Sequence, residues 1–209
     1  MLVGTWLMHI RQAALSGCLV AATVAGGALI AGAAVAQRSV TSRVPIVVNS
    51  IFSNIDYENN TADFTDIIVS QGDTRLTAER ASAAGVGFMD SQWTFAGRVV
   101  IVLEPRGSLS ADQAILQFRN GELTQVIATG SPVYFEQRRT DSRRPGHGHA
   151  DQITYDAKED TVRLYGHPQL SDGSGVEISA PAFVYHVRDE RLQNDSQGAR
   201  RVVHITIKP

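Results

Sequence analysis

The chain has 209 residues, of which 43% are hydrophobic, 19% charged and 7% aromatic, and its formal net charge is −2. This length is typical of one domain, or of two at most. The charge balance leaves no large basic surface, which excludes duplex DNA or RNA as the expected partner. Cys18 is the only cysteine, so the sequence after it excludes a disulfide framework and a thiolate metal site.

The amino-terminal segment differs from the rest of the chain. From Ala13 to Ala36 it carries no charge, consists mainly of Ala, Val, Leu and Gly, and ends in Ala34-Val35-Ala36. Small residues at both ends of that tripeptide fit a signal peptidase, so we predict a signal peptide over residues 1–36 and one domain over residues 37–209. A retained anchor is the alternative, because an uncharged stretch of this length can span a bilayer. In both cases the body of the protein lies across a membrane from the cytoplasm.

Two short half-motifs recur along the body of the chain. The first contains an alanine, usually followed by an acidic or polar residue, and its copies are Leu76–Ala81, Leu109–Ala114, His149–Ile153 and Ile178–Ala182. The second contains a glycine, and its copies are Phe95–Val99, Ala128–Pro132 and Leu164–Pro168. An earlier, degenerate copy has Asp66 in place of the glycine. Repeats of roughly 30 to 40 residues are typical of stacked or rolled architectures whose units share one interior.

Apolar and polar residues alternate within these repeats, as in Val99/Ile101 and Val203/Ile205/Ile207. This period of two is typical of half-buried β-strands, and turn-forming residues such as Asn120-Gly121 separate the apolar segments. The body contains no convincing long amphipathic helix, and the repeat assigns the start of the Ala-rich stretch Ala78–Ala84 to a strand. We therefore predict an all-β fold of repeated antiparallel strands. The periodicity leaves open whether side chains fill the interior, as in an ordinary sandwich, or whether it holds a ligand.

Six runs follow one another along the body of the chain: Phe95–Ile101, Leu109–Asp112, Gly130–Gln137, Gly148–Tyr155, Val162–Gly166 and Arg201–Pro209. Together they resemble the LptA/OstA-like family of periplasmic lipopolysaccharide transport proteins, and the resemblance covers about Thr74 to Pro209. No single run is specific, but their order and gaps together are fairly specific. The stretch from Val44 to Gly72 departs from the family pattern and reads as an extra repeat at the amino end.

The resemblance implies a β-jellyroll folded like a taco shell (a β-taco), with an apolar groove along its length. It implies a periplasmic bridge protein that carries the lipid A chains of lipopolysaccharide from the inner to the outer membrane, without a cofactor and without enzymatic activity. The expected partners are lipopolysaccharide, an inner-membrane LptC-like protein, an outer-membrane LptD-like protein and further copies of the chain stacked head to tail. Two alternatives are an anchored LptC-like component of the same pathway and a structural β-repeat module that only binds proteins through its edges.

The alternation within each strand predicts which side chains line the groove and contact lipid. Phe135 and Tyr155 also match aromatic or apolar positions that face the groove in the family pattern. A one-residue shift of register would move a whole strand's set to the other face. The predicted lipid-binding residues are Leu76, Phe95, Val99, Ile101, Leu109, Ile115, Phe135, Ile153, Tyr155, Val162, Leu164, Leu170, Ile178 and Phe183.

Other polar clusters suggest no catalytic or metal site. His147 and His149 are close in sequence, but no carboxylate or cysteine nearby completes a ligand set. Arg138, Arg139, Arg143 and Arg144 form a basic loop that could meet lipid phosphates, although a solvated loop is the better interpretation. Glu79, Asp112 and Asp151 recur at repeat positions, which favours a structural role in turns. No nucleophile elbow or phosphate-binding loop is recognisable.

Overall fold

A computed structural model describes most of the chain after residue 43. The described residues are 44–85, 87, 89–105, 107–138, 145–189, 191–195 and 202–207. The expected signal peptide and the arginines at positions 139, 143 and 144 lie outside them. Every regular element in the described part is a β-strand, and these strands form one 14-stranded antiparallel sheet. Nothing in those ranges forms a helix that could cross a membrane.

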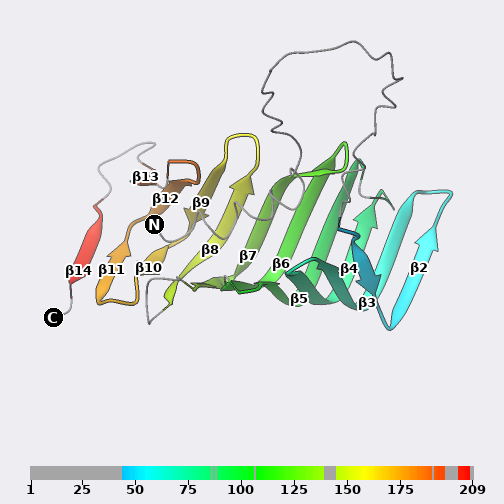
Figure 1. Cartoon of the computed structure of the whole chain (residues 1–209), viewed down its shortest axis with the longest axis horizontal. Helices are drawn as coiled ribbons and strands as arrows, with labels where there is room; N and C mark the ends of the chain where they lie inside the picture. Colours follow the sequence, from blue (N-terminus) through cyan, green and yellow to red (C-terminus); the bar gives the residue numbers. More distant parts are fainter. Residues whose placement is uncertain are drawn as a thin grey trace, which may run out of the picture.

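Long strands joined by hairpins form the middle of the sheet (Figure 1). They follow one another in chain order as β3 (Thr61–Gln71), β4 (Thr74–Ala84), β5 (Ser91–Leu103), β6 (Gly107–Arg119), β7 (Glu122–Gln137) and β8 (Gly146–Asp156). The Ala-rich stretch lies in β4, as the repeat predicts. The expected all-β jellyroll fold is therefore confirmed.

The sheet divides into two branches at each end. At the amino end, β1 (Val47–Asn49) and β2 (Phe52–Asp56) pair with opposite halves of β3. At the other end, β9 (Thr161–Tyr165) and β10 (Gln169–Ser171) pair with opposite halves of β8. One branch continues through β12 (Ala182–His186) to β13 (Arg191–Asn194), and the other through β11 (Val176–Ser179) to β14 (His204–Ile207).

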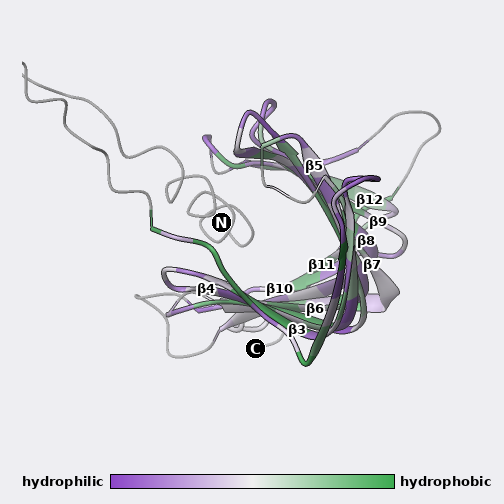
Figure 2. Cartoon of the chain, turned by 90° about the vertical axis from the view of Figure 1, so that its right-hand side faces the viewer, coloured by the Kyte–Doolittle hydropathy of each residue, from purple (hydrophilic) through white to green (hydrophobic). Residues whose placement is uncertain are grey.

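The sheet is folded lengthwise into two facing arms, which Figure 2 shows end on. We call the arm that ends in β2 and β13 the first arm, and the arm that ends in β1 and β14 the second arm. The line between them, the crease, is where the pairing register shifts: between Thr77 and Arg80, Ala96 and Val99, Ser110 and Gln113, and Thr129 and Val133. Such bulges bend strands and increase their twist, so the two sequence half-motifs encode the crease.

Left-handed backbone conformations mark the same line. They occur at Asp66 (φ 50°), Gly97 (φ 79°), Arg98 (φ 44°), Gly166 (φ 74°) and His167 (φ 52°). Glycine adopts this conformation at little cost, and aspartate is among the residues that tolerate it best. The degenerate repeat copy at Asp66 therefore keeps the left-handed backbone of the copies with Gly97 and Gly166, which the copy with Gly130 does not share.

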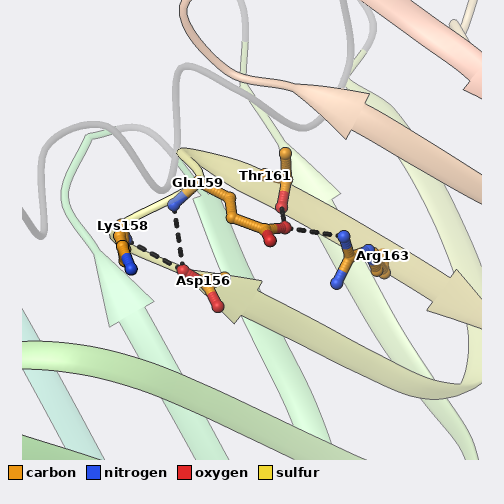
Figure 3. Close-up of polar contacts among 5 residues, drawn as sticks. All are labelled: Asp156, Lys158, Glu159, Thr161 and Arg163. Carbon is orange, nitrogen blue, oxygen red and sulfur yellow. Dashed lines mark hydrogen bonds and ion pairs between the residues drawn. The ribbon is translucent and has the colours of Figure 1, made fainter.

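Two hairpins of the first arm, β8–β9 and β2–β3, close with turns of the same kind. In the β8–β9 turn, Oδ1 of Asp156 accepts hydrogen bonds from the backbone N–H groups of Lys158 (2.9 Å) and Glu159 (3.0 Å), as Figure 3 shows. Glu159 in turn forms an ion pair with Arg163 at 2.6 Å. In the β2–β3 turn, Asp56 accepts from the two corresponding N–H groups, both at 3.0 Å. Aspartate at this position replaces the missing backbone acceptor of the turn.

Candidate functional site

The concave, inner face of the folded sheet carries a row of apolar side chains along the second arm. Each member pairs directly with the next across the sheet, so the row runs from edge strand to edge strand. Its members are Val48, Val69, Leu76, Ile101, Leu109, Phe135, Gly148, Leu170, Ile178 and Ile205. The row contains no charged residue.

The first arm carries two uncharged, mainly apolar rows side by side on its inner face, and the second of them ends in the polar residues Ser53 and Asn194. One consists of Ile55, Ala62, Ala83, Trp93, Leu116, Val126, Tyr155, Val162, Tyr185 and Leu192. The other consists of Ser53, Phe64, Ala81, Phe95, Ala114, Ala128, Ile153, Leu164, Phe183 and Asn194. Charged residues are absent from these rows as well, so both arms present apolar surfaces to each other.

The two arms differ in the kind of apolar surface they carry. The inner row of the second arm is aliphatic except for Phe135. The first arm carries an aromatic stack near its amino end, in which the Trp93 ring lies 5.5 Å from Phe64 and 6.1 Å from Phe95 between centroids. Ala81 and Ala83 stand on β4 between the strands of these rings. Their small side chains leave the space in which the rings stack, and such stacked pairs contribute stability beyond their buried area.

All predicted lining residues except Ile115 lie on this inner face or on the crease. Val99, Val162 and Leu164 are fully buried, and Ile178 is partly buried near the carboxyl-terminal edge. The other members, also buried, are Leu76, Phe95, Ile101, Leu109, Phe135, Ile153, Tyr155, Leu170 and Phe183. The positions therefore come together as two facing surfaces of one sheet.

Ile115 requires a correction, because it lies on the outer face. Its cross-strand partners are Thr94 and Ile127, whereas its chain neighbours Ala114 and Leu116 belong to the inner rows. The register shift in β6 explains the error: the alternation that places Leu109 inside is interrupted at the crease, so the inner positions beyond it are even-numbered. Ile115 and Ile127 instead form an outer cross-strand pair, of a kind that stabilises sheets.

Sequence reasoning missed several lining residues, among them Trp93, Leu116 and Tyr185. Two of these were detectable, because Trp93 has the parity of Phe95, and Tyr185 has the parity of Phe183. Leu116 was hidden by the same register shift that misplaced Ile115. Val48 and Val69, which begin the row of the second arm, lie in the segment that departs from the family pattern.

Two of the acidic repeat residues, Glu79 and Asp151, lie at the crease, each beside a glycine of the neighbouring strand. Glu79 forms an ion pair with Arg98 at 2.6 Å, and Asp151 lies 3.5 Å from Nδ1 of His167. These contacts support a structural role for Glu79 and Asp151, but at bends inside β4 and β8 and not in the turns that the repeat suggested. His147 and His149 both project from the outer face of β8, where the His149 ring lies 5.9 Å from the Tyr134 ring. No group of metal-ligating side chains large enough to hold an ion occurs in the part of the chain that the structure describes.

Both ends of the sheet expose apolar side chains beside unpaired strand edges. At the amino end, Ile51 is 82% exposed and Phe52 is 62% exposed. At the carboxyl end, Ile205 is 61% exposed and Ile207 is 73% exposed. An unpaired edge of this kind offers backbone hydrogen-bonding groups to another strand.

Comparison with known proteins gives relatives of one kind. A family model described as "LptA/(LptD N-terminal domain) LPS transport protein" matches residues 83–191. The lipopolysaccharide export system protein LptA of Escherichia coli K12 is 24% identical over 164 residues, which cover 78% of this chain and 71% of the relative, and the Shigella flexneri LptA matches equally well. The crystal structure of Pseudomonas aeruginosa LptH, an LptA-homologous periplasmic component, matches with a TM-score of 0.46 and 17% identity over 79% of this chain and 96% of that one. The chain belongs to the LptA/LptD N-terminal domain family of lipopolysaccharide transport proteins.

Proposed function

We propose that this protein is a periplasmic bridge component that carries lipopolysaccharide from the inner to the outer membrane. Family membership supports the transport role, and the matched relatives are named as export or transport proteins. The observation that carries the proposal is the uncharged inner surface that runs from one edge strand to the other on both arms. In this role the acyl chains of the lipid lie against the inner face, and the protein makes and breaks no covalent bonds.

The cost of exposing lipid chains to water explains why such a surface is needed. Burying one methylene group contributes about 0.8 kcal/mol, so exposing a chain of about a dozen carbons costs on the order of 10 kcal/mol. The acyl chains of such a lipid must therefore be shielded from water at every step across an aqueous compartment. A row of similar apolar side chains provides cover of similar strength along its length, so the lipid does not stall at one position.

The same inner positions define the proposed lipid contacts. Phe135 supplies the one aromatic ring of the second-arm row, and Tyr155 lies in a row of the first arm. We assign lipid contact to these two and to the other predicted inner residues, without Ile115. The aliphatic second arm suits saturated acyl chains in particular, because it carries no polar side chain along its row.

The exposed edges suit strand addition by neighbouring components. A strand added at an unpaired edge gains backbone hydrogen bonds, and its alternating side chains extend the inner face. We propose that one end of the sheet receives an LptC-like protein, that the other end meets an LptD-like protein, and that further copies of the chain stack head to tail between them. The inner rows would then continue from one component to the next.

Site-specific photo-crosslinking tests the proposed function. A photo-reactive residue is placed at Phe135 or Leu164, and its matched outer neighbour, Tyr134 or Arg163, serves as the control on the same strand. The proposal predicts lipopolysaccharide adducts at both inner positions and none at the outer ones. Equal labelling at inner and outer positions, or no adduct at any inner position in cells that transport lipopolysaccharide, would overturn it.

A further inference from the structure

The two ends of the sheet carry opposite charges on outer-facing positions of the first arm. We propose that, when copies stack head to tail as the proposed function requires, Arg191 on β13 of one copy pairs with Asp56 on β2 of the next. The pair fixes both the polarity and the register of the joint. The argument has three steps: strand direction, continuity of the inner rows, and charge.

Strand direction allows both arms to join at once. The second arm runs β1-β3-β4-β5-β6-β7-β8-β10-β11-β14, and the first arm runs from β2 through β3 to β8, then β9, β12 and β13. Every neighbouring pair is antiparallel and each path contains an even number of strands, so its two end strands point in opposite directions. A second copy in the same orientation therefore places β1 against β14 and β2 against β13, both antiparallel.

Continuity of the inner rows then selects one register. Within the chain, Ile55 and Leu192 end one row of the first arm, and Ser53 and Asn194 end the other. If the rows continue across the joint, Leu192 lies opposite Ile55, and Asn194 lies opposite Ser53. Both matches belong to the same antiparallel register, because Ser53 and Ile55 are two positions apart on β2, and Leu192 and Asn194 are two positions apart on β13. That register sets Arg191 directly opposite Asp56 on the outer face.

Charge distinguishes the head-to-tail joint from joints between two like ends of the sheet. A joint between two carboxyl ends would bring β13 against β13 or β14, whose sequences Arg-Leu-Gln-Asn and His-Ile-Thr-Ile contain no carboxylate. A joint between two amino ends would bring together β1 and β2, whose sequences Val-Val-Asn and Phe-Ser-Asn-Ile-Asp contain no cation. Only the head-to-tail joint places opposite charges side by side.

Both charged groups are held in position at the strand edges, where Arg191 is exposed and Asp56 is partly exposed. The Arg191 guanidinium is oriented by Gln193. With the Gln193 side-chain oxygen turned toward Arg191, this oxygen accepts hydrogen bonds from Nε and from an Nη of Arg191 at 2.8 Å each. The Asp56 carboxylate accepts from the Asn59 side chain at 2.6 Å and from two backbone N–H groups. Because the Asn59 side chain and these N–H groups stabilise the ionised form, the pKa of Asp56 is lowered, and the carboxylate stays charged at neutral pH.

A charge-swap experiment on the full mature chain tests the pair, with self-association measured by sedimentation velocity at low ionic strength. Asp56→Lys and Arg191→Glu each place like charges at the joint, and each should weaken self-association about fivefold to tenfold. The double variant should regain the wild-type association constant, and an equimolar mixture of the two single variants should form mixed dimers. The effect of each single change should shrink at high salt, since the pair is solvent-exposed.

Three controls keep the result interpretable. Arg188→Glu makes the same charge change on the neighbouring turn and should leave association unchanged. Asp56→Asn retains a side-chain oxygen for the turn and separates loss of charge from loss of the turn, while thermal unfolding checks that each variant folds. If both single reversals associate as strongly as wild type, or if the double variant associates no more strongly than either single one, the Arg191–Asp56 pairing is wrong. Either result still leaves head-to-tail stacking possible. If wild type remains monomeric at every concentration tested, head-to-tail stacking itself is wrong.

Discussion

The carboxylate of Glu79 on β4 lies against the α-carbon of Gly97 on β5, and its Oε1 pairs with Nε of Arg98 at 2.6 Å. A β-carbon at position 97 would overlap that carboxylate. The same arrangement recurs in the β8–β9 hairpin, where the Asp151 carboxylate lies against Gly166. In these two hairpins the crease therefore consists of an acidic residue on one strand packed against a left-handed glycine on the next, and this packing explains why the two half-motifs occur together there. At the β6–β7 copy Gly130 is not left-handed, and a β-carbon on it would meet the backbone of Pro132 and Val133 instead.

Gly97→Ala is expected to destabilise the protein by about 1–3 kcal/mol, because alanine must adopt the left-handed conformation and also displace Glu79. Chemical denaturation monitored by circular dichroism measures the change in the free energy of unfolding. Gly87→Ala is the matched control, since a β-carbon there meets only one atom, at 4.0 Å, and it should leave stability nearly unchanged. Combining Gly97→Ala with Glu79→Ala should recover only the part of the lost unfolding free energy that comes from overlap between the new β-carbon and the Glu79 side chain. Equal stability of the two single glycine variants would contradict this account of the crease.

The fold was predictable because its information is local and repeated. Period-two alternation identifies strands, turn residues separate them, and the half-motifs recur wherever the sheet bends. Asp66 shows how far this extends, since it was recognisable as a stand-in for glycine and adopts the same left-handed backbone as Gly97. The resemblance to a known family then supplied the way in which the sheet is folded.

The residues that line the inner face were less predictable. Alternation assigns a residue to a face only if the face of another residue on the same strand is known and no bulge lies between the two. The bulge between Ser110 and Gln113 removes that reference halfway along β6, and Ile115 consequently was placed on the wrong face. Pairing between distant ends is also invisible in the sequence. The opposition of Arg191 and Asp56 requires the strand count and the cross-strand register, neither of which a local pattern contains.

Ile178→Asp is expected to weaken lipopolysaccharide binding by about tenfold or more, because it places a charge in the apolar row of the second arm, and burial of an unpaired charge is costly. Ile178 is only partly buried, so the variant should still fold. Ser179→Asp puts the same charge on the outer face of the same strand and is the control. Displacement of a fluorescent acyl-chain probe measures binding, and thermal unfolding measures folding. Similar losses of binding in both variants would exclude the inner face as the binding surface.

The turn between β10 and β11 should weaken in acid. The side chain and backbone N–H of Ser174 donate to Asp172 at 2.5 and 2.8 Å, and these bonds hold the pKa of Asp172 below its ordinary value of 3.8. A carboxyl whose folded pKa is lowered contributes stability above its unfolded pKa and loses that contribution as the pH falls through its folded pKa. The carboxyl carbon of Asp172 in an NMR titration should therefore show a midpoint below 3.8. A midpoint at or above that value would show that the turn does not hold the ionised carboxylate.

Ile205→Asp should weaken self-association while leaving the fold intact. Ile205 ends the inner row of the second arm, pairs with Ile178 on β11, and is 61% exposed in the isolated chain. Because little of its surface is buried within one copy, the substitution should change the midpoint of thermal unfolding only slightly. In a head-to-tail joint the same side chain meets Val48 of the next copy, where a carboxylate would interrupt the apolar row. Val202→Asp, an exposed apolar position that precedes β14, is the matched control, and sedimentation velocity compares the two. If only Val202→Asp reduces association, copies join through the segment before β14 and the inner rows do not continue between them.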